Sequence, residues 1–121
     1  MSWFIEALNN ATISGATLTT LQSTTATFNA GQVVVNWSIS GFCDQAGTGF
    51  QYRFRIGDQT GPWKQYFFSN VGRADISGTA VIPVPPGASP VSLEMQRTYG
   101  SGSFLLTNAD SLLATFINIR Q

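Results

Sequence analysis

The chain has 121 residues, no histidine, a single cysteine, and six acidic and six basic residues, so its formal net charge is zero. Charged residues make up 10% of the chain, against about a quarter in ordinary soluble proteins. This composition excludes histidine-based nucleophile pairs and an intrachain disulfide, and it provides no basic surplus that would attract nucleic acid or anionic membranes. We therefore expect no catalytic site, no metal or cofactor, and no nucleic-acid or membrane partner.

The first segment, residues 1–12, stands apart because it carries large apolar residues before any clear strand pattern. These residues are Trp3, Phe4, Ile5 and Leu8. The segment can be a short helix with one apolar face or an extended arm. It lacks the basic start and the long apolar stretch of a secretory signal. We predict an N-terminal arm over residues 1–12, followed by one domain over residues 13–121.

Period-two alternation, typical of strands that bury one face, predicts the first half of the domain. One or two strands are expected within residues 12–28. Residues 32–40 place Val33, Val35, Trp37 and Ile39 on one face. Residues 50–56 form the cleanest strand pattern, with Phe50, Tyr52, Phe54 and Ile56 on one face and polar residues on the other.

Further strands are predicted over residues 63–69, 78–84, 90–99, 103–107 and 112–121, separated by segments rich in Gly, Pro, Asn and Asp. Pro83 indicates a strand end or an edge strand. Aromatic residues expected in the core are Trp37, Phe50, Phe54 and Phe67. Short strands at this spacing predict an all-β fold, an antiparallel jelly roll or β-sandwich of about eight strands. An immunoglobulin-like sandwich is the alternative.

Aromatic residues beside the Gly-Pro turn at residues 61–62 provide a candidate binding site. Trp63 and Tyr66 can form a flat platform on which a sugar ring stacks, or they can belong to the core. Arg53 and Arg55 share the polar face of one strand, where we expect solvated or interfacial charge. Cys43 is expected to be a small, partly buried apolar residue near a loop.

The last predicted strand is apolar on both faces. One face carries Leu113, Thr115, Ile117 and Ile119, and the other carries Leu112, Ala114 and Phe116. A strand with one solvated face alternates more cleanly than this. The second face is therefore expected to be covered by another subunit or by the N-terminal segment of the same chain.

Residues 78–121, which contain "GTAVIPVPPGASPVSLEMQRTYGSGSFLLTNADSLLATFINI", resemble the second half of the compact trimeric jelly rolls related to the C1q and tumour necrosis factor folds. "VNWSISGF" followed by "FQYRFRI" is similar to the first half. Domains of this kind occur in tailed bacteriophages as fibre tips and as capsid decoration (cement) proteins. No collagen-like or coiled-coil stalk precedes the domain, which favours decoration over a fibre.

The resemblance implies a homotrimeric structural protein of the virion, made in the host cytoplasm, that binds the major capsid protein on the outer capsid surface. In this interpretation Leu112, Ala114 and Phe116 form the trimer interface. The arm residues Trp3, Phe4, Ile5 and Leu8 anchor the trimer to the capsid. The alternative is a receptor- or carbohydrate-binding module that uses Trp63 and Tyr66.

Overall fold

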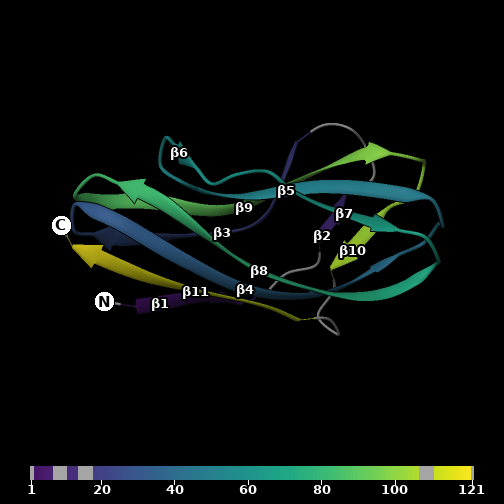
Figure 1. The fold of residues 1–121 in the computed structure, drawn as a ribbon, viewed down its shortest axis with the longest axis horizontal. Helices are drawn as coiled ribbons and strands as arrows, with labels where there is room; N and C mark the ends of the chain where they lie inside the picture. Colours follow the sequence, from purple (N-terminus) through teal and green to yellow (C-terminus); the bar gives the residue numbers. More distant parts are fainter. Residues whose placement is uncertain (1, 7–10, 14–17, 107–110, 121) are drawn as a thin grey trace.

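A computed structural model describes residues 2–6, 11–13, 18–106 and 111–120, and these form two antiparallel β-sheets packed face to face (Figure 1). The predicted all-β antiparallel sandwich is thus confirmed. No helix long and apolar enough to span a membrane occurs in these residues. The helical alternative for the start of the chain does not apply to residues 2–6, which form a strand.

The first sheet has six strands, and its central strand is β4. Its members are β1 (Ser2–Glu6), β11 (Ser111–Arg120), β4 (Gly31–Cys43), β8 (Gly72–Val84), β10 (Phe104–Leu106) and β2 (Ala11–Ile13). β4 pairs with β11 on one side and with β8 on the other, and β1 pairs with the outer side of β11. β8 is therefore an edge strand that ends one residue after Pro83, as this proline predicts.

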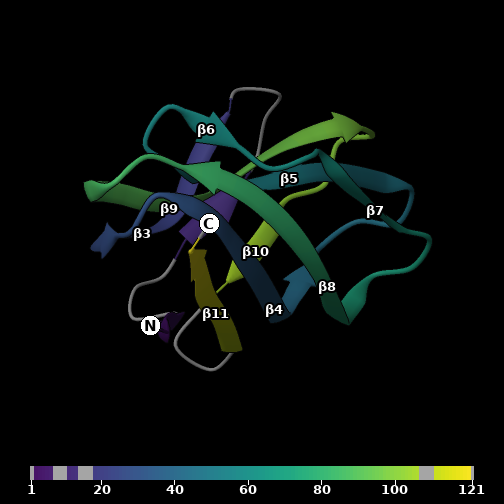
Figure 2. The ribbon, with the colours of Figure 1, turned by 60° about the vertical axis from the view of Figure 1, so that its left-hand side comes forward.

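The second sheet has five strands. They are β3 (Thr19–Phe28), β9 (Gly87–Tyr99), β5 (Thr48–Ile56), β6 (Gln59–Thr60) and β7 (Lys64–Phe68). β9 pairs with β3 and β5, and β5 also pairs with β6 and β7. Figure 2 shows the two layers from another side. The chain changes sheet after β2, β3, β4, β7, β8 and β9. This order differs from the ABED and CFG sheets of immunoglobulin-like domains, where the chain crosses between sheets less often.

The core forms where the predicted period-two faces of β4 and β5 meet. Val33, Val35 and Ile39 of β4 are fully buried, as are the apolar residues of β5 at alternate positions. Aromatic rings interlock across this space: Phe54 packs against Trp37 and, edge-on, against Phe116. These contacts explain why strands with alternating apolar residues form a two-layer sandwich, since each sheet buries its apolar face against the other.

Two aromatic residues, Phe67 and Tyr99, lie on the surface, although Phe67 was predicted to be in the core. Phe67 is exposed because Tyr66 and Phe68, its neighbours along β7, point inward opposite Phe50 and Thr48. Tyr99 is exposed because the pairing of β9 with β5 shifts register between Gly49 and Phe50. Such a bulge reverses the side-chain alternation beyond it. The core assignment of Phe67 is therefore wrong.

Two buried polar residues join strand ends through hydrogen bonds. The Asn118 side chain accepts a hydrogen bond from Asn29 N at 2.7 Å and donates to Asn29 O and Gln32 O. The Thr48 hydroxyl donates to Gln45 O and accepts from Gly102 N. Because these polar groups are satisfied, they can occupy the interior without the cost of an unpaired buried donor or acceptor.

Candidate functional site

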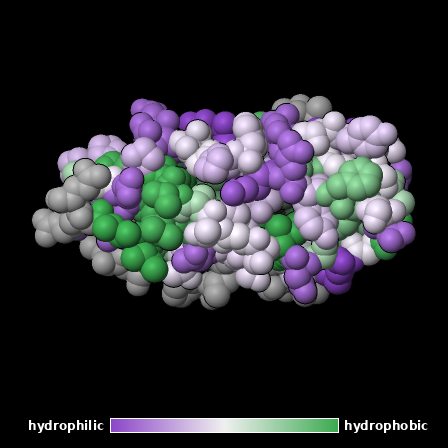
Figure 3. Space-filling view, viewed as in Figure 1, coloured by the Kyte–Doolittle hydropathy of each residue, from purple (hydrophilic) through white to green (hydrophobic). Residues whose placement is uncertain are grey.

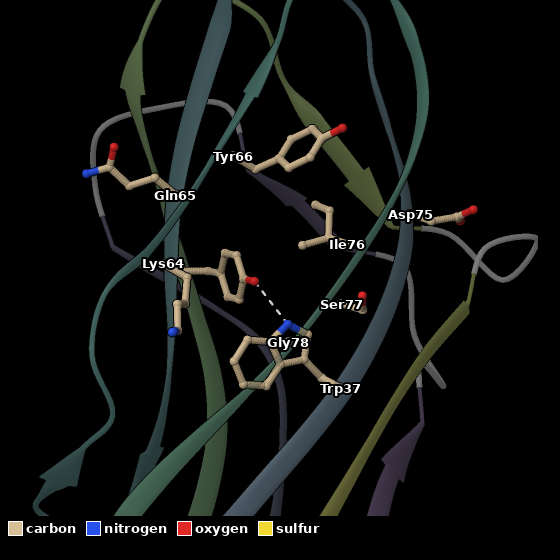
Figure 4. A pocket seen from close by; sticks show the side chains of 9 residues that line it. Trp37, Lys64, Gln65, Tyr66, Asp75, Ile76, Ser77 and Gly78 are labelled. Atoms are coloured by element: carbon tan, nitrogen blue, oxygen red, sulfur yellow. Dashed lines mark hydrogen bonds between the residues drawn. The ribbon is translucent and has the colours of Figure 1, made fainter.

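A pocket of about 350 Å³ opens between the edge strands β7 and β8, which belong to opposite sheets (Figure 4). Its inner walls are Trp37, Tyr52, Lys64, Tyr66, Ile76 and Gly78, with Gln65, Asp75 and Ser77 at the rim. In Figure 4, the Gln65 amide and the Asp75 carboxylate point away from the opening on opposite sides. The pocket therefore combines aromatic and apolar walls with several polar side chains, so it can contact both the apolar and the polar parts of a small ligand.

The floor of the pocket is a polar contact between the two sheets. The Trp37 indole Nε1–H donates to the Tyr52 hydroxyl oxygen at 2.9 Å, and the two rings meet edge-on at 5.7 Å. Burial raises the pKa of Tyr52 above its ordinary value of 10.0, although the hydrogen bond from Trp37 partly opposes this effect. The Tyr52 phenol therefore keeps its proton at neutral pH and can act as a hydrogen-bond donor.

Gly78 is the residue that makes room for the Trp37 ring. Trp37 and Gly78 are paired across β4 and β8. A Cβ atom on Gly78 would lie 2.5 Å from Trp37 Cζ2, which is closer than side chains tolerate. The missing side chain at this position lets the indole lie against β8 and line the pocket.

The sequence-predicted stacking residues Trp63 and Tyr66 do not form one platform. Tyr66 points inward from β7, lines the pocket and packs against Phe68 at 4.8 Å between ring centroids. Trp63 instead stacks with Arg53 on the outer face of the second sheet, with the guanidinium carbon 4.1 Å from the ring centroid. Of the predicted pair, only Tyr66 belongs to the pocket.

The predicted trimer-interface residues of β11 require a correction. Ala114 and Phe116 are both 0% exposed and point into the core of their own chain. They lie opposite Trp37 and Val35 of β4, which are also buried. Contact with another subunit is therefore ruled out for these two side chains in the folded chain. Leu112 is described only by its backbone, which pairs with Ile39.

The opposite face of β11 is the one that reaches the surface. Ile117 is 41% exposed and Ile119 is 49% exposed. Ile117 is paired with Val34 of β4, and Val34 is paired with Val81 of β8, which is 50% exposed. We call Val34, Val81, Ile117 and Ile119 the outer patch. Figure 3 shows a hydrophobic area on the left of the view, where Figure 1 shows the start of β4 and the ends of β8 and β11.

The predicted arm contains a strand of the first sheet. Within β1, the backbones of Trp3, Phe4 and Ile5 pair with Phe116, Thr115 and Ala114. Leu8 lies outside the described residues. Residues 2–6 are thus joined to the domain by strand pairing, and β1 forms an edge of the sheet next to β11.

A charged cluster occupies the outer face of the second sheet. Arg53 Nε and Arg55 Nε both donate to Glu94 Oε1, at 3.0 and 3.3 Å. The two arginines, expected to be solvated or interfacial, form this ion-pair network. Cys43 is fully buried, and its thiol lies 3.3 Å from Gln45 O. Within the described part of the chain, no three His, Cys, Asp or Glu residues gather as a metal site would require.

Trp37 and Tyr52 were not predicted as site residues, because the alternation of their strands assigns Trp37 to the core and Tyr52 to a buried face. Both assignments are correct, since both residues are buried, but the two also form the pocket floor. The pocket depends on the pairing of Trp37 with Gly78 across β4 and β8. The positions of these two residues in the sequence do not reveal that they are paired.

Comparison of the chain with protein-family models and with curated proteins gives no match. The function is therefore argued from the outer patch, the pocket and the fold.

Proposed function

We propose that this protein is a homotrimeric structural protein of a virion that decorates the outer surface of a capsid. The observation that carries the proposal is the outer patch, which lies on β4, β8 and β11 of the first sheet. An isoleucine and two valines lie side by side on three neighbouring strands, with Ile119 next to them. A cluster of half-exposed branched apolar residues on a sheet face is typical of a protein interface.

Composition and fold support a self-associating subunit. The chain has zero formal net charge and only 10% charged residues, so long-range repulsion between copies is small. We infer a jelly roll from the eight strands of five or more residues. When these eight strands are numbered along the chain, they lie side by side in the order 1-8-3-6 in the first sheet and 2-7-4-5 in the second sheet. This interlocking order supports the resemblance to trimeric virion domains, from which the threefold symmetry and the capsid role are taken.

The arm retains its proposed role as the capsid contact, now as a strand. β1 is an edge strand, and an edge strand can add to a strand of another protein. In a trimer, three such edges would bind the major capsid protein at once, which raises the overall affinity through effective concentration.

Light scattering after size-exclusion chromatography tests the assembly. The expected mass is about three times the 13.0 kDa of the chain. Ile117→Lys places a charge in the outer patch and should give a folded monomer. Ser23→Lys is the matched control, because Ser23 is exposed on the other sheet and should leave the trimer intact. A monomeric wild-type protein at micromolar concentration, or an unchanged Ile117→Lys trimer, would contradict the proposal.

The capsid role is tested on purified particles of the virus that encodes the chain. Mass spectrometry should find the protein in the particles, and imaging should place it on the outer surface. A variant with Trp3→Ala and Phe4→Ala should remain a trimer and lose decoration if β1 is the anchor. Absence of the protein from particles would reject the virion role, and decoration by the double variant with unchanged affinity would reject the anchor alone.

A further inference from the structure

We propose that the pocket between β7 and β8 binds a sugar ring, with the Tyr52 hydroxyl donating a hydrogen bond to one of its oxygens. This binding activity is separate from assembly through the outer patch. The patch lies on the outer face of the first sheet, whereas the pocket opens between the edges of the two sheets.

The first argument is an unused donor at the pocket floor. Tyr52 is 3% exposed, and its oxygen accepts the hydrogen bond from Trp37. Among the residues that the structure describes, no acceptor receives the proton of the Tyr52 hydroxyl. A buried hydroxyl normally uses its donor, since leaving it unpaired is costly. The Tyr52 hydroxyl lines an open pocket, where an oxygen atom of a ligand can accept its hydrogen bond.

The second argument is the chemistry of the walls. Trp37 and Tyr66 line the pocket with aromatic surface from opposite sheets, and Ile76 adds apolar surface from β8. An aromatic face is electron-rich and attracts partly positive C–H groups. A pyranose ring offers such C–H groups on its faces and oxygens around its edge. One ring can therefore contact the aromatic walls and accept the Tyr52 hydrogen bond together.

The third argument is the kind of polar group that the pocket supplies. Tyr52 supplies a neutral hydroxyl, and Lys64 is the charged residue on the inner wall. The Lys64 ammonium group donates hydrogen bonds and never accepts them. In the described part of the chain, Lys64 forms no ion pair. Two donors on aromatic walls favour a ligand rich in oxygen acceptors, whether these are sugar hydroxyls or a sugar carboxylate.

The volume limits the ligand to a small sugar. About 350 Å³ is at the lower end of the range of roughly 300–1,000 Å³ for ligand pockets. The pocket therefore accommodates one sugar ring, while any further rings of a glycan extend outside it past Gln65 and Asp75 at the rim.

The test is saturation-transfer NMR on the full chain with a panel of neutral and acidic sugars. The neutral probes are glucose, galactose and N-acetylglucosamine, and the acidic probes are glucuronic acid and N-acetylneuraminic acid. At least one should bind with a Kd of about 1 mM or lower. Lys64→Gln separates the two groups, because it removes the positive charge and keeps an N–H donor, so it should weaken binding of an acidic sugar more than binding of a neutral sugar.

Two adjacent residues of β7 provide a matched pair of variants. Tyr66→Ala removes an inner wall and should weaken binding at least tenfold. Phe67→Ala removes an exposed ring on the opposite face of the same strand and should leave binding unchanged. Tyr52→Phe should also weaken binding about tenfold, the loss expected for one hydrogen bond.

A measurement on the wild-type protein keeps the proposal testable if a variant does not fold. Bound sugar should shift the NMR signal of the Trp37 indole N–H, and the Trp63 signal, identified by its loss in Trp63→Phe, should remain in place. Three results would overturn the proposal: no probe binds the wild type at about 10 mM, the Trp37 signal does not respond to a sugar that binds, or Phe67→Ala abolishes binding while Tyr66→Ala preserves it.

Discussion

Trp37 of the first sheet and Tyr52 of the second sheet are joined by a hydrogen bond of 2.9 Å from the indole nitrogen to the phenol oxygen. Both residues are buried, so the bond forms a polar connection inside an otherwise apolar interface between the sheets. A polar pair of this kind holds the two sheets in one alignment, because sliding them would leave both groups unsatisfied. The pair therefore influences the stability of the sandwich as well as the floor of the pocket.

Tyr52→Phe should lower the free energy of unfolding by about 1–3 kcal/mol, because it leaves the buried Trp37 N–H without its acceptor. Chemical denaturation measures the loss. Tyr66→Phe is the control, since no hydrogen bond of the Tyr66 hydroxyl occurs within the described residues. Equal stability losses in the two variants would show that the Trp37–Tyr52 bond contributes little.

Stability should also fall at alkaline pH through Tyr52. Its folded-state pKa lies above the ordinary 10.0 because burial disfavours the phenolate. The contribution of Tyr52 is thus complete below about pH 10 and decreases as the pH rises toward the folded-state pKa, since the unfolded chain loses this proton first. Denaturation at a series of alkaline pH values measures the effect. A Tyr52→Phe variant with the same pH dependence as the wild type would contradict this assignment.

Phe116→Ala should destabilise the folded chain by about 3–5 kcal/mol, because it empties a fully buried site beside Phe54. Ile117→Ala, one residue further along β11, should affect assembly more than folding, because Ile117 is on the surface. Denaturation and light scattering on both variants separate the two effects. If Phe116→Ala dissociates the protein without loss of folding stability, the inward orientation of Phe116 is refuted.

Glu94→Gln should lower the free energy of unfolding by about 1–3 kcal/mol, since the two guanidinium groups of Arg53 and Arg55 then lose their shared carboxylate. Asp58→Asn provides a matched change of charge at an exposed residue and should have little effect. Thermal unfolding of both variants, repeated at high salt, measures the difference. A Glu94→Gln variant as stable as Asp58→Asn would show that the cluster is only a surface ion pair of the kind that adds little.

The sequence by itself determined most of the strands of the domain and most of their inward faces, but it did not identify β1 or β6. The side chains of a strand alternate between its two faces, so the pattern of residues 50–56 identifies a buried face without knowledge of any partner. β4 followed the same rule, with Val33, Val35, Trp37 and Ile39 buried. β8 was predicted only from Gly78 onward, because its first half, with Arg73 and Asp75 outside and Ala74 and Ile76 inside, carries a weaker apolar pattern.

Only the tertiary structure decided which face of the last strand lies inside. Both faces of β11 are apolar, so alternation alone could not choose between them. Pairing places Phe116 opposite Val35, and one shared core buries both, which leaves Ile117 outside beside Val34. The pocket was decided in the same way, because Trp37 and Gly78 are 41 residues apart in the chain and become neighbours only when β8 pairs with β4. Local sequence specifies the alternation within a strand, whereas the partner strand and the opposing sheet determine what each face contacts.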